Sequence, residues 1–190
     1  MKKIAIIGDG NVGSALARGI GRAGYEVRAT GKENVRDTAA WGEVIILAVP
    51  FAAVPDVVKT IGDAANGKVV IDVTNALNRD MTLAVGFTTS GAEELQKQAT
   101  GAKVVKAFNT VFAQHMDSGK IGSETLTVLA ASDDEEAKST ALELAKAIGF
   151  DAVNAGPLQN ARWLETLALL NITLGYVVGH GVNAGFRYIH

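Results

Sequence analysis

The sequence predicts an α/β fold built on a doubly wound parallel sheet, with a small helical segment at the C-terminal end. Three observations support this prediction. Short apolar runs alternate with helical patterns along the chain, which is typical of βαβ units. The runs are apolar on both faces, as strands inside a parallel sheet are. The first run leads into a glycine pattern. The predicted strands are Ile4–Ile7, Glu26–Thr30, Val44–Val49, Lys68–Val73, Lys103–Phe108, Thr125–Ala130 and Asp151–Asn154.

The glycine pattern follows the first strand directly. Gly8, Gly10 and Gly13 have the spacing G-x-G-x-x-G, and a helical pattern covers Asn11–Ala23. Gly8 allows a tight turn, Gly10 lets the backbone approach a pyrophosphate, and Gly13 lets the helix pack on the strand. The free N–H groups of the first helical turn would face the negative charge. A simple strand-to-helix turn is the alternative, but this order favours a dinucleotide site in a Rossmann-type fold.

Further helical patterns follow the later strands. They cover Val54–Ile61, Ala92–Ala99 and Asp134–Ile148. The last one opens with Ser132 as a serine cap, followed by acidic residues, and closes at Gly149. Only Gly31–Glu43 separates the second strand from the third, so at most one helical turn fits there, around Val35–Ala40. The segment Thr82–Ser90 is predicted to be a mobile loop.

The C-terminal part differs from the rest. Pro157 precedes a long apolar helical stretch over about Leu158–Val178, as proline often does at a helix start. We therefore expect a dinucleotide-binding Rossmann domain over residues 1–156 and a helical segment over residues 157–190. Apolar residues cover more than one side of this helix, whereas one sheet can bury only one side. The sequence therefore predicts a homodimer.

Composition limits the classes of function. Of 190 residues, 48% are hydrophobic, which is enough for one core, and the net charge of −2 argues against a nucleic-acid partner. The chain has no cysteine, which excludes thiolate chemistry and fits a reducing cytosol. The apolar stretch Leu164–Phe186 is interrupted by polar residues, and Ile4–Ile7 is too short for a signal peptide. We expect a cytoplasmic protein without a membrane partner. No metal site is expected, since His180 and His190 stand alone.

The end of the second strand bears on the choice of nucleotide. An NAD site usually carries Asp or Glu there, but this strand ends at Thr30-Gly31 and Lys32 follows. Lys32 and Arg36 suit the 2′-phosphate of NADP, and the Thr30 hydroxyl could donate to it. A solvated loop charge is the alternative for Lys32, and Glu33 runs against the assignment. We predict NADP as the cofactor.

Other candidate residues follow the strand ends, where ligands of open α/β sheets bind. Pro50 and Phe51 follow the third strand, and Asn75 follows the fourth. An asparagine both donates and accepts, which suits the nicotinamide ribose or carboxamide. Core packing of Phe51 and an Asx turn at Asn75 are the alternatives. Lys106, within the fifth strand, is expected to point outward. The predicted cofactor-binding residues are Gly8, Asp9, Gly10, Asn11, Val12, Gly13, Thr30, Gly31, Lys32, Arg36, Ala48, Val49, Pro50, Phe51, Asn75 and Asn109.

Five motifs occur in order along the chain: GDGNVG, LAVPFAAV, VVIDVTNAL, VVKAFNT and NAGPLQNARWLE. In this order they resemble the deazaflavin-dependent NADP oxidoreductase family, which uses coenzyme F420. The resemblance implies a Rossmann domain that carries NADP, a C-terminal segment that closes the active-site cleft and builds a dimer, and hydride exchange between nicotinamide and deazaflavin. The family usually has Gly-Ser-Arg where this chain has Thr30-Gly31-Lys32, and its next helix–strand module is longer. Some relatives pass electrons to flavin or iron.

The sequence contains no Ser/His/Asp set, paired carboxylates or zinc-type spacing. Hydride transfer between two bound coenzymes needs none, because the rings carry the chemistry and the protein supplies geometry and excludes water. Asn109 and Thr110 are predicted to position the rings. A salt bridge is the alternative for Arg162. The predicted second-substrate residues are Asn109, Thr110, Pro157, Asn160 and Arg162. The alternative function is a non-catalytic NADP-binding module that senses redox state or serves as a subunit.

Overall fold

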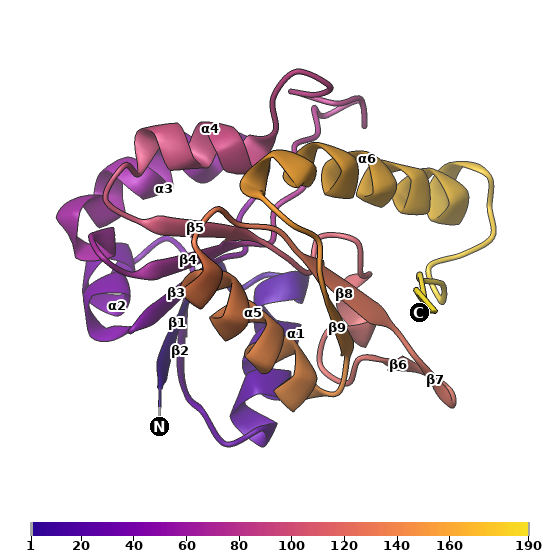
Figure 1. Cartoon of the computed structure of the whole chain (residues 1–190), viewed down its shortest axis with the longest axis horizontal. Coiled ribbons are helices and arrows are strands. Elements are labelled where there is room, and N and C mark those ends of the chain that lie inside the picture. Colours follow the sequence, from indigo (N-terminus) through magenta and orange to yellow (C-terminus); the bar gives the residue numbers. More distant parts are fainter. Residues whose placement is uncertain (1, 190) are drawn as a thin grey trace.

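The computed structural model describes residues 2–189 (Figure 1). Within them, five parallel strands form the central sheet, in the order β2-β1-β3-β4-β5. The strands are β1 (Lys3–Ile7), β2 (Glu26–Thr30), β3 (Val44–Leu47), β4 (Val69–Asp72) and β5 (Lys103–Lys106). The strand order reverses between β1 and β3, which makes the sheet doubly wound. The predicted Rossmann-type fold is confirmed.

Helices cover both faces of this sheet (Figure 1). They are α1 (Asn11–Arg22), α2 (Val35–Trp41), α3 (Val54–Ile61), α4 (Gly91–Gln98) and α5 (Glu135–Ile148). Alternate side chains of β1 show the division: Ile4 and Ile6 pack with α1 and α5, whereas Ala5 and Ile7 pack with α2, α3 and α4. Each face of the sheet therefore has its own apolar core, as the nearly continuous apolar strands predict.

Two further strands extend the structure beside β5. β8 (Thr127–Ala130) and β9 (Asp151–Asn154) pair with each other in parallel. β8 runs antiparallel to β5, to which one bridge between Lys106 and Ala131 joins it. A short ribbon of β6 (Lys120–Ile121) and β7 (Glu124–Thr125) precedes them.

Two local predictions are wrong. The segment after β2 forms two turns of helix, α2, rather than one. The cap of α5 is Asp134, whose carboxylate accepts a hydrogen bond from the Ala137 N–H at 2.8 Å. Ser132, the predicted cap, instead donates its hydroxyl proton to the carbonyl of Val104 in β5 at 2.6 Å. Ser132, Asp133 and Asp134 can all serve as helix caps. Because the Ser132 hydroxyl is bonded to β5, it cannot cap α5.

The C-terminal segment crosses back over the strand ends (Figure 1). It contains a 3₁₀ turn (Leu158–Asn160), α6 (Ala161–Ile172) and a π-helical turn (Thr173–Val177). The chain then returns to β8, where the Thr127 N–H donates to the Phe186 carbonyl at 3.0 Å. Between residues 2 and 189, no helix combines the length and the apolarity that crossing a membrane requires.

Candidate functional site

The glycine loop between β1 and α1 has the geometry that its spacing predicts. Gly8 has φ +116°, and a Cβ there would lie 2.2 Å from the Ala48 carbonyl oxygen. A Cβ at Gly13 would lie 1.8 Å from the Gly8 carbonyl oxygen, so only glycine lets the helix pack this closely. A Cβ at Gly10 would meet no described atom within 4 Å. The backbone at Gly10 therefore faces open space, where a phosphate can approach it.

Two adjoining hollows lie along the carboxyl ends of the strands. The first, of about 400 Å³, is lined by the glycine loop, by Gly31 and Lys32 after β2, and by α3. The second, of about 290 Å³, extends to Thr74 and Asn75 after β4. They share Gly10, Ala48, Val49 and Pro50 and together form one groove at this edge of the sheet. Gly10 is the N-cap of α1, no described side chain caps this helix, and its first turn holds no acidic residue. The groove thus fits a dinucleotide, with the pyrophosphate at the α1 N-terminus.

The first end of the groove carries charges of both signs. Lys32 lines it, is exposed and forms no ion pair with any residue from 2 to 189. Asp9 and Asp56 line it as well. The Asp9 carboxylate lies against Gly31, where an added Cβ would be 2.8 Å from its Oδ2 atom. Lys32 is therefore the cation that this end offers to a phosphate.

Three of the predicted cofactor contacts are directed elsewhere. The Thr30 hydroxyl donates to the backbone carbonyl of Glu33, so its proton is not free for a phosphate. Arg36 forms an ion pair with Asp63, and it is not among the residues that line the two hollows. Phe51 packs against α4, where a Cβ at Gly91 would lie 2.9 Å from its ring. Phe51 is partly buried, and its packing favours the alternative of core packing.

At the other end of the groove, the structure brings together the predicted asparagines. Asn109 is buried, and its Nδ2 donates to Asn75 Oδ1 at 3.3 Å and to the Leu164 carbonyl at 3.0 Å. Phe108 has φ +64°, a costly conformation for a bulky residue, which turns the chain just before Asn109. The Thr110 carbonyl accepts from Asn171 Nδ2 at 3.0 Å. Two amide hydrogen bonds thus fix α6 to the loop after β5.

A buried charge cluster lies directly behind these strand ends. Lys106 is fully buried, and its Nζ lies 2.9 Å from Asp72 Oδ2 and 3.0 Å from Glu165 Oε1. The prediction that Lys106 points outward is wrong. Burial by itself would lower the pKa of Lys106, but the two carboxylates outweigh it and raise the pKa above its ordinary value. Glu165 also accepts from the Gly91 and Ala92 N–H groups, so it caps α4. The sequence feature that could have indicated this cluster is the presence of Asp72 and Lys106 within otherwise apolar strands.

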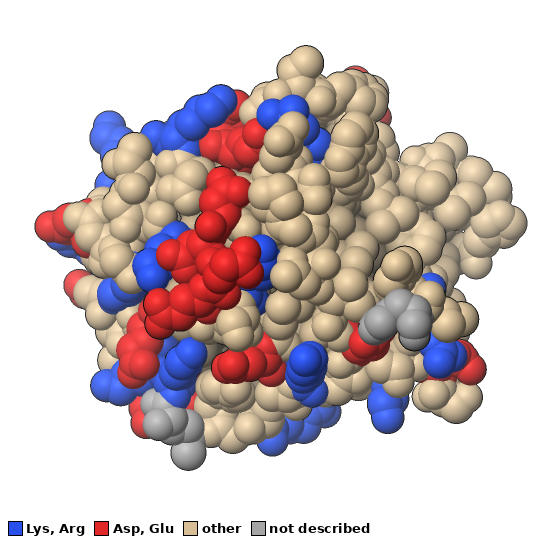
Figure 2. Space-filling view, in the orientation of Figure 1, with Lys and Arg blue, Asp and Glu red and all other residues tan. Residues whose placement is uncertain are grey.

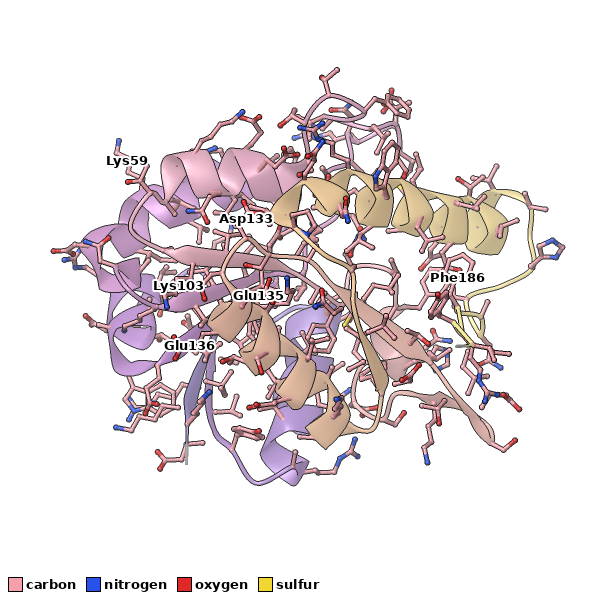
Figure 3. The ribbon with its side chains drawn as sticks, viewed as in Figure 1. Lys59, Lys103, Asp133, Glu135, Glu136 and Phe186 are labelled. Carbon is pink, nitrogen blue, oxygen red and sulfur yellow. The ribbon has the colours of Figure 1, made fainter. Side chains whose placement is uncertain are left out.

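The predicted second-substrate residues of the C-terminal segment lie apart from the groove. The turn at Pro157 is held by the Leu158 N–H, which donates to Asp133 Oδ1 at 2.9 Å. Asn160 Nδ2 donates to the Ala155 carbonyl at 2.6 Å, within the same turn. Lys103 begins β5 and forms ion pairs with Asp134 and Glu136, which follow Asp133 in the chain (Figure 3 labels Lys103, Asp133 and Glu136). The turn bonded to Asp133 therefore lies toward the end of β5 opposite to Asn109. Pro157 and Asn160 therefore line no part of the groove.

Arg162 forms a paired contact with α4. Its Nε and Nη2 atoms lie 2.9 Å and 2.7 Å from the two carboxylate oxygens of Glu93. The hydrogen bonds from Arg162 lower the pKa of Glu93 below its ordinary value. The salt-bridge alternative for Arg162 is therefore correct, and the pair ties α6 to α4.

A third hollow, of about 330 Å³, shares Asn11 with the groove. Its walls are α1, the segment after Thr110 and the π-helical turn. Two aromatic rings, Phe112 and Tyr176, meet edge to face with their centroids 5.8 Å apart. The other lining residues are Ser14, Arg18, Ala113 and Gln114. Sequence reasoning missed this hollow because its walls come from distant parts of the chain.

Comparisons with known proteins identify the family of this chain. A family model described as "NADP oxidoreductase coenzyme F420-dependent" matches residues 3–41 and 32–76. The F420-dependent NADP reductase of Methanothermobacter marburgensis is 32% identical over 170 residues, which cover 85% of this chain and 75% of that protein. The metalloreductase STEAP3 of Rattus norvegicus is 30% identical over 183 residues, which cover 88% of this chain but 36% of that protein.

A solved structure is similar over the whole chain. The crystal structure of a candidate F420-dependent NADP reductase from Arthrobacter sp. FB24 matches with a TM-score of 0.93 and 26% identity. The match covers 100% of both chains. The motif order, the glycine loop and these similarities agree with one another. The chain belongs to the coenzyme F420-dependent NADP oxidoreductase family.

Proposed function

We propose that this chain is an oxidoreductase that transfers a hydride between NADP(H) and a deazaflavin coenzyme of the F420 type. The observation that supports this most directly is the groove, which runs from an anion-binding helix terminus past Lys32 in one direction and to Asn75 in the other. The glycine loop in its middle and the polar residues at its two ends suit a dinucleotide. The names of the Methanothermobacter reductase and of the family support the choice of NADP and of F420.

In this proposal, residues along the groove bind different parts of the cofactor. The glycine loop and the α1 N-terminus hold the pyrophosphate, and Lys32 contacts the 2′-phosphate. Asn75 and Asn109 orient the nicotinamide, whose ring supplies or accepts the hydride when it is bound. Thr110 fixes the loop of Asn109 through its carbonyl bond to α6. The protein thus contributes orientation and exclusion of water rather than acid–base chemistry.

The acceptor ring binds in the third hollow in this proposal, beside the nicotinamide. This hollow shares Asn11 with the groove and presents the rings of Phe112 and Tyr176. Aromatic walls suit a planar heterocycle. The observed places of Pro157 and Asn160 favour this hollow over the turn that the sequence suggested.

The helical segment over residues 157–190 closes the site and forms a homodimer in the same proposal. Figure 2 shows few charges over α6 and the C-terminal segment, whereas charges gather over the opposite half of this face. Exposed apolar side chains support this reading: Trp163, Leu170, Tyr176, Val177 and Val178. Light scattering should give twice the chain mass of 19.8 kDa at micromolar concentration, and the mass of one chain would contradict the dimer. A cytoplasmic location accords with the absence of cysteine.

The test is NADPH oxidation by the purified chain with a panel of acceptors. The panel is F420, FMN, FAD and a ferric chelate, the last because of the similarity to a metalloreductase. Rapid oxidation with F420 and slow oxidation with the others is the expected result. Oxidation of NADPH with the ferric chelate alone would contradict the proposal that a deazaflavin is the electron acceptor. Tight NADPH binding without oxidation by any acceptor would favour the alternative of a non-catalytic redox-sensing module or subunit.

A further inference from the structure

Two polar atoms behind the groove lack a partner. Within residues 2–189, Thr74 Oγ1 and Asn109 Oδ1 are the buried side-chain atoms without any hydrogen bond. Both residues are 4% exposed, and they follow neighbouring strands of the sheet. Thr74 lines the groove, and Asn109 is bonded to Asn75, which lines it too. Buried polar groups are nearly always satisfied in folded proteins, so two exceptions at one site point to a missing ligand.

The charge cluster holds the backbone of Thr74 in place. The Thr74 N–H donates to Asp72 Oδ1 at 2.8 Å, and its carbonyl accepts from Lys106 Nζ at 2.7 Å. Lys106 in turn is held by Glu165, which is anchored on the N-terminus of α4. The backbone of Thr74 is thus clamped on both sides by buried charges.

In the Asn109 side chain, the amide nitrogen is hydrogen-bonded and the oxygen is not. Its amide nitrogen has two acceptors in reach, Asn75 Oδ1 and the Leu164 carbonyl. An amide nitrogen has two protons to donate, and these two acceptors use both. The oxygen is therefore left as a free acceptor, while the Thr74 hydroxyl is left as a free donor.

We propose that Thr74 Oγ1 and Asn109 Oδ1 together bind the carboxamide of the nicotinamide ring. The threonine hydroxyl donates to the carboxamide oxygen, and the asparagine oxygen accepts from the carboxamide NH₂ group. A carboxamide carries an acceptor and a donor side by side, which complements the two free atoms. This inference rests on the proposed function, and it adds Thr74 to the predicted cofactor contacts.

The test compares Thr74→Val with the wild type. Valine has nearly the same shape and lacks only the hydroxyl. Because that hydroxyl has no partner in the protein alone, the melting temperature without ligand should stay the same or rise. The dissociation constant for NADP⁺, measured by calorimetry, should rise about three- to tenfold, which corresponds to one lost neutral hydrogen bond. Thr74→Ser should restore most of the affinity.

Two controls separate this role from a structural one. The first is 2′-phospho-ADP-ribose, which lacks the nicotinamide ring and should bind wild type and Thr74→Val equally. The second is Thr127→Val. Thr127 is also buried, but its hydroxyl is bonded to Asp151 and to the Tyr188 N–H. This variant should melt at a lower temperature and bind NADP⁺ as the wild type does.

The 3-acetylpyridine analogue of NADP⁺ tests the part of Asn109. It keeps the carbonyl oxygen and replaces the amino group by methyl, so wild type should bind it more weakly than NADP⁺. Equal binding of the two would overturn the role of Asn109. An unchanged NADP⁺ affinity in Thr74→Val, or an equal loss for 2′-phospho-ADP-ribose, would overturn the role of Thr74. A wild type that binds no NADP(H) at all would overturn the proposed function first, and this inference with it.

Discussion

Replacing Lys106 by Met gives the most direct test of the buried charge cluster. The change removes the cation and leaves the carboxylates of Asp72 and Glu165 buried, each with 2% of its side chain exposed. Removing one partner of a buried ion pair costs about 3–5 kcal/mol of the free energy of unfolding. The lower part of that range applies here, because both carboxylates keep backbone N–H donors at 2.8–3.2 Å.

The expected loss is a large part of the total stability, which is about 5–15 kcal/mol for a typical domain. For a chain of this size, a loss of about 3–4 kcal/mol corresponds to a fall of about 6–16 °C in melting temperature. Circular dichroism during thermal and urea unfolding would measure it.

The matched control is Lys97→Met, since Lys97 is 65% exposed and pairs with Glu94 one helical turn away. Such a surface pair contributes less than about 1 kcal/mol. A loss in Lys106→Met no larger than in Lys97→Met would refute the reasoning. A triple variant that also carries Asp72→Asn and Glu165→Gln should recover part of the loss, because no unpaired charge then remains.

Three further predictions concern the loop, the phosphate contact and the α4–α6 pair. Gly13→Ala should prevent correct folding, because its Cβ would lie 1.8 Å from a backbone oxygen. Gly10→Ala should fold normally and lose NADPH affinity. Equal melting temperatures of the two variants would contradict this prediction. Lys32→Ala should weaken NADPH binding by about 1.5–3 kcal/mol and leave NADH binding unchanged, and equal weakening of both would remove Lys32 from the site. Because hydrogen bonds from Arg162 lower the pKa of Glu93, the pair should stabilise the fold above the ordinary carboxyl pKa of about 4.3 and lose this effect as pH falls below it. Glu93→Gln should therefore melt below wild type at neutral pH, and this difference should shrink as pH falls from the ordinary carboxyl pKa through the lowered pKa of Glu93; a difference that stays constant as the pH is lowered would count against the pair.

Local patterns predicted most elements, because their causes are local. The helix over Val54–Ile61 was predicted with the bounds that it has, since apolar spacing marks a helix directly. The cap of α5 was not, because Ser132 and Asp134 both suit that place. A contact from Ser132 to the carbonyl of Val104 decides between them, and no local pattern contains it.

The sequence by itself determined the dinucleotide loop and the alternation of strands and helices. Both depend on backbone sterics and side-chain periodicity within a few residues, as the fit of Gly8 and Gly13 shows. Only the tertiary structure decided which polar side chains remain free. Arg162 pairs with Glu93 from another helix, and Lys106 is buried between carboxylates from β4 and α6. The partner of a charged group lies wherever folding brings another element, so its availability for a ligand is a property of the packed molecule and not of the local sequence.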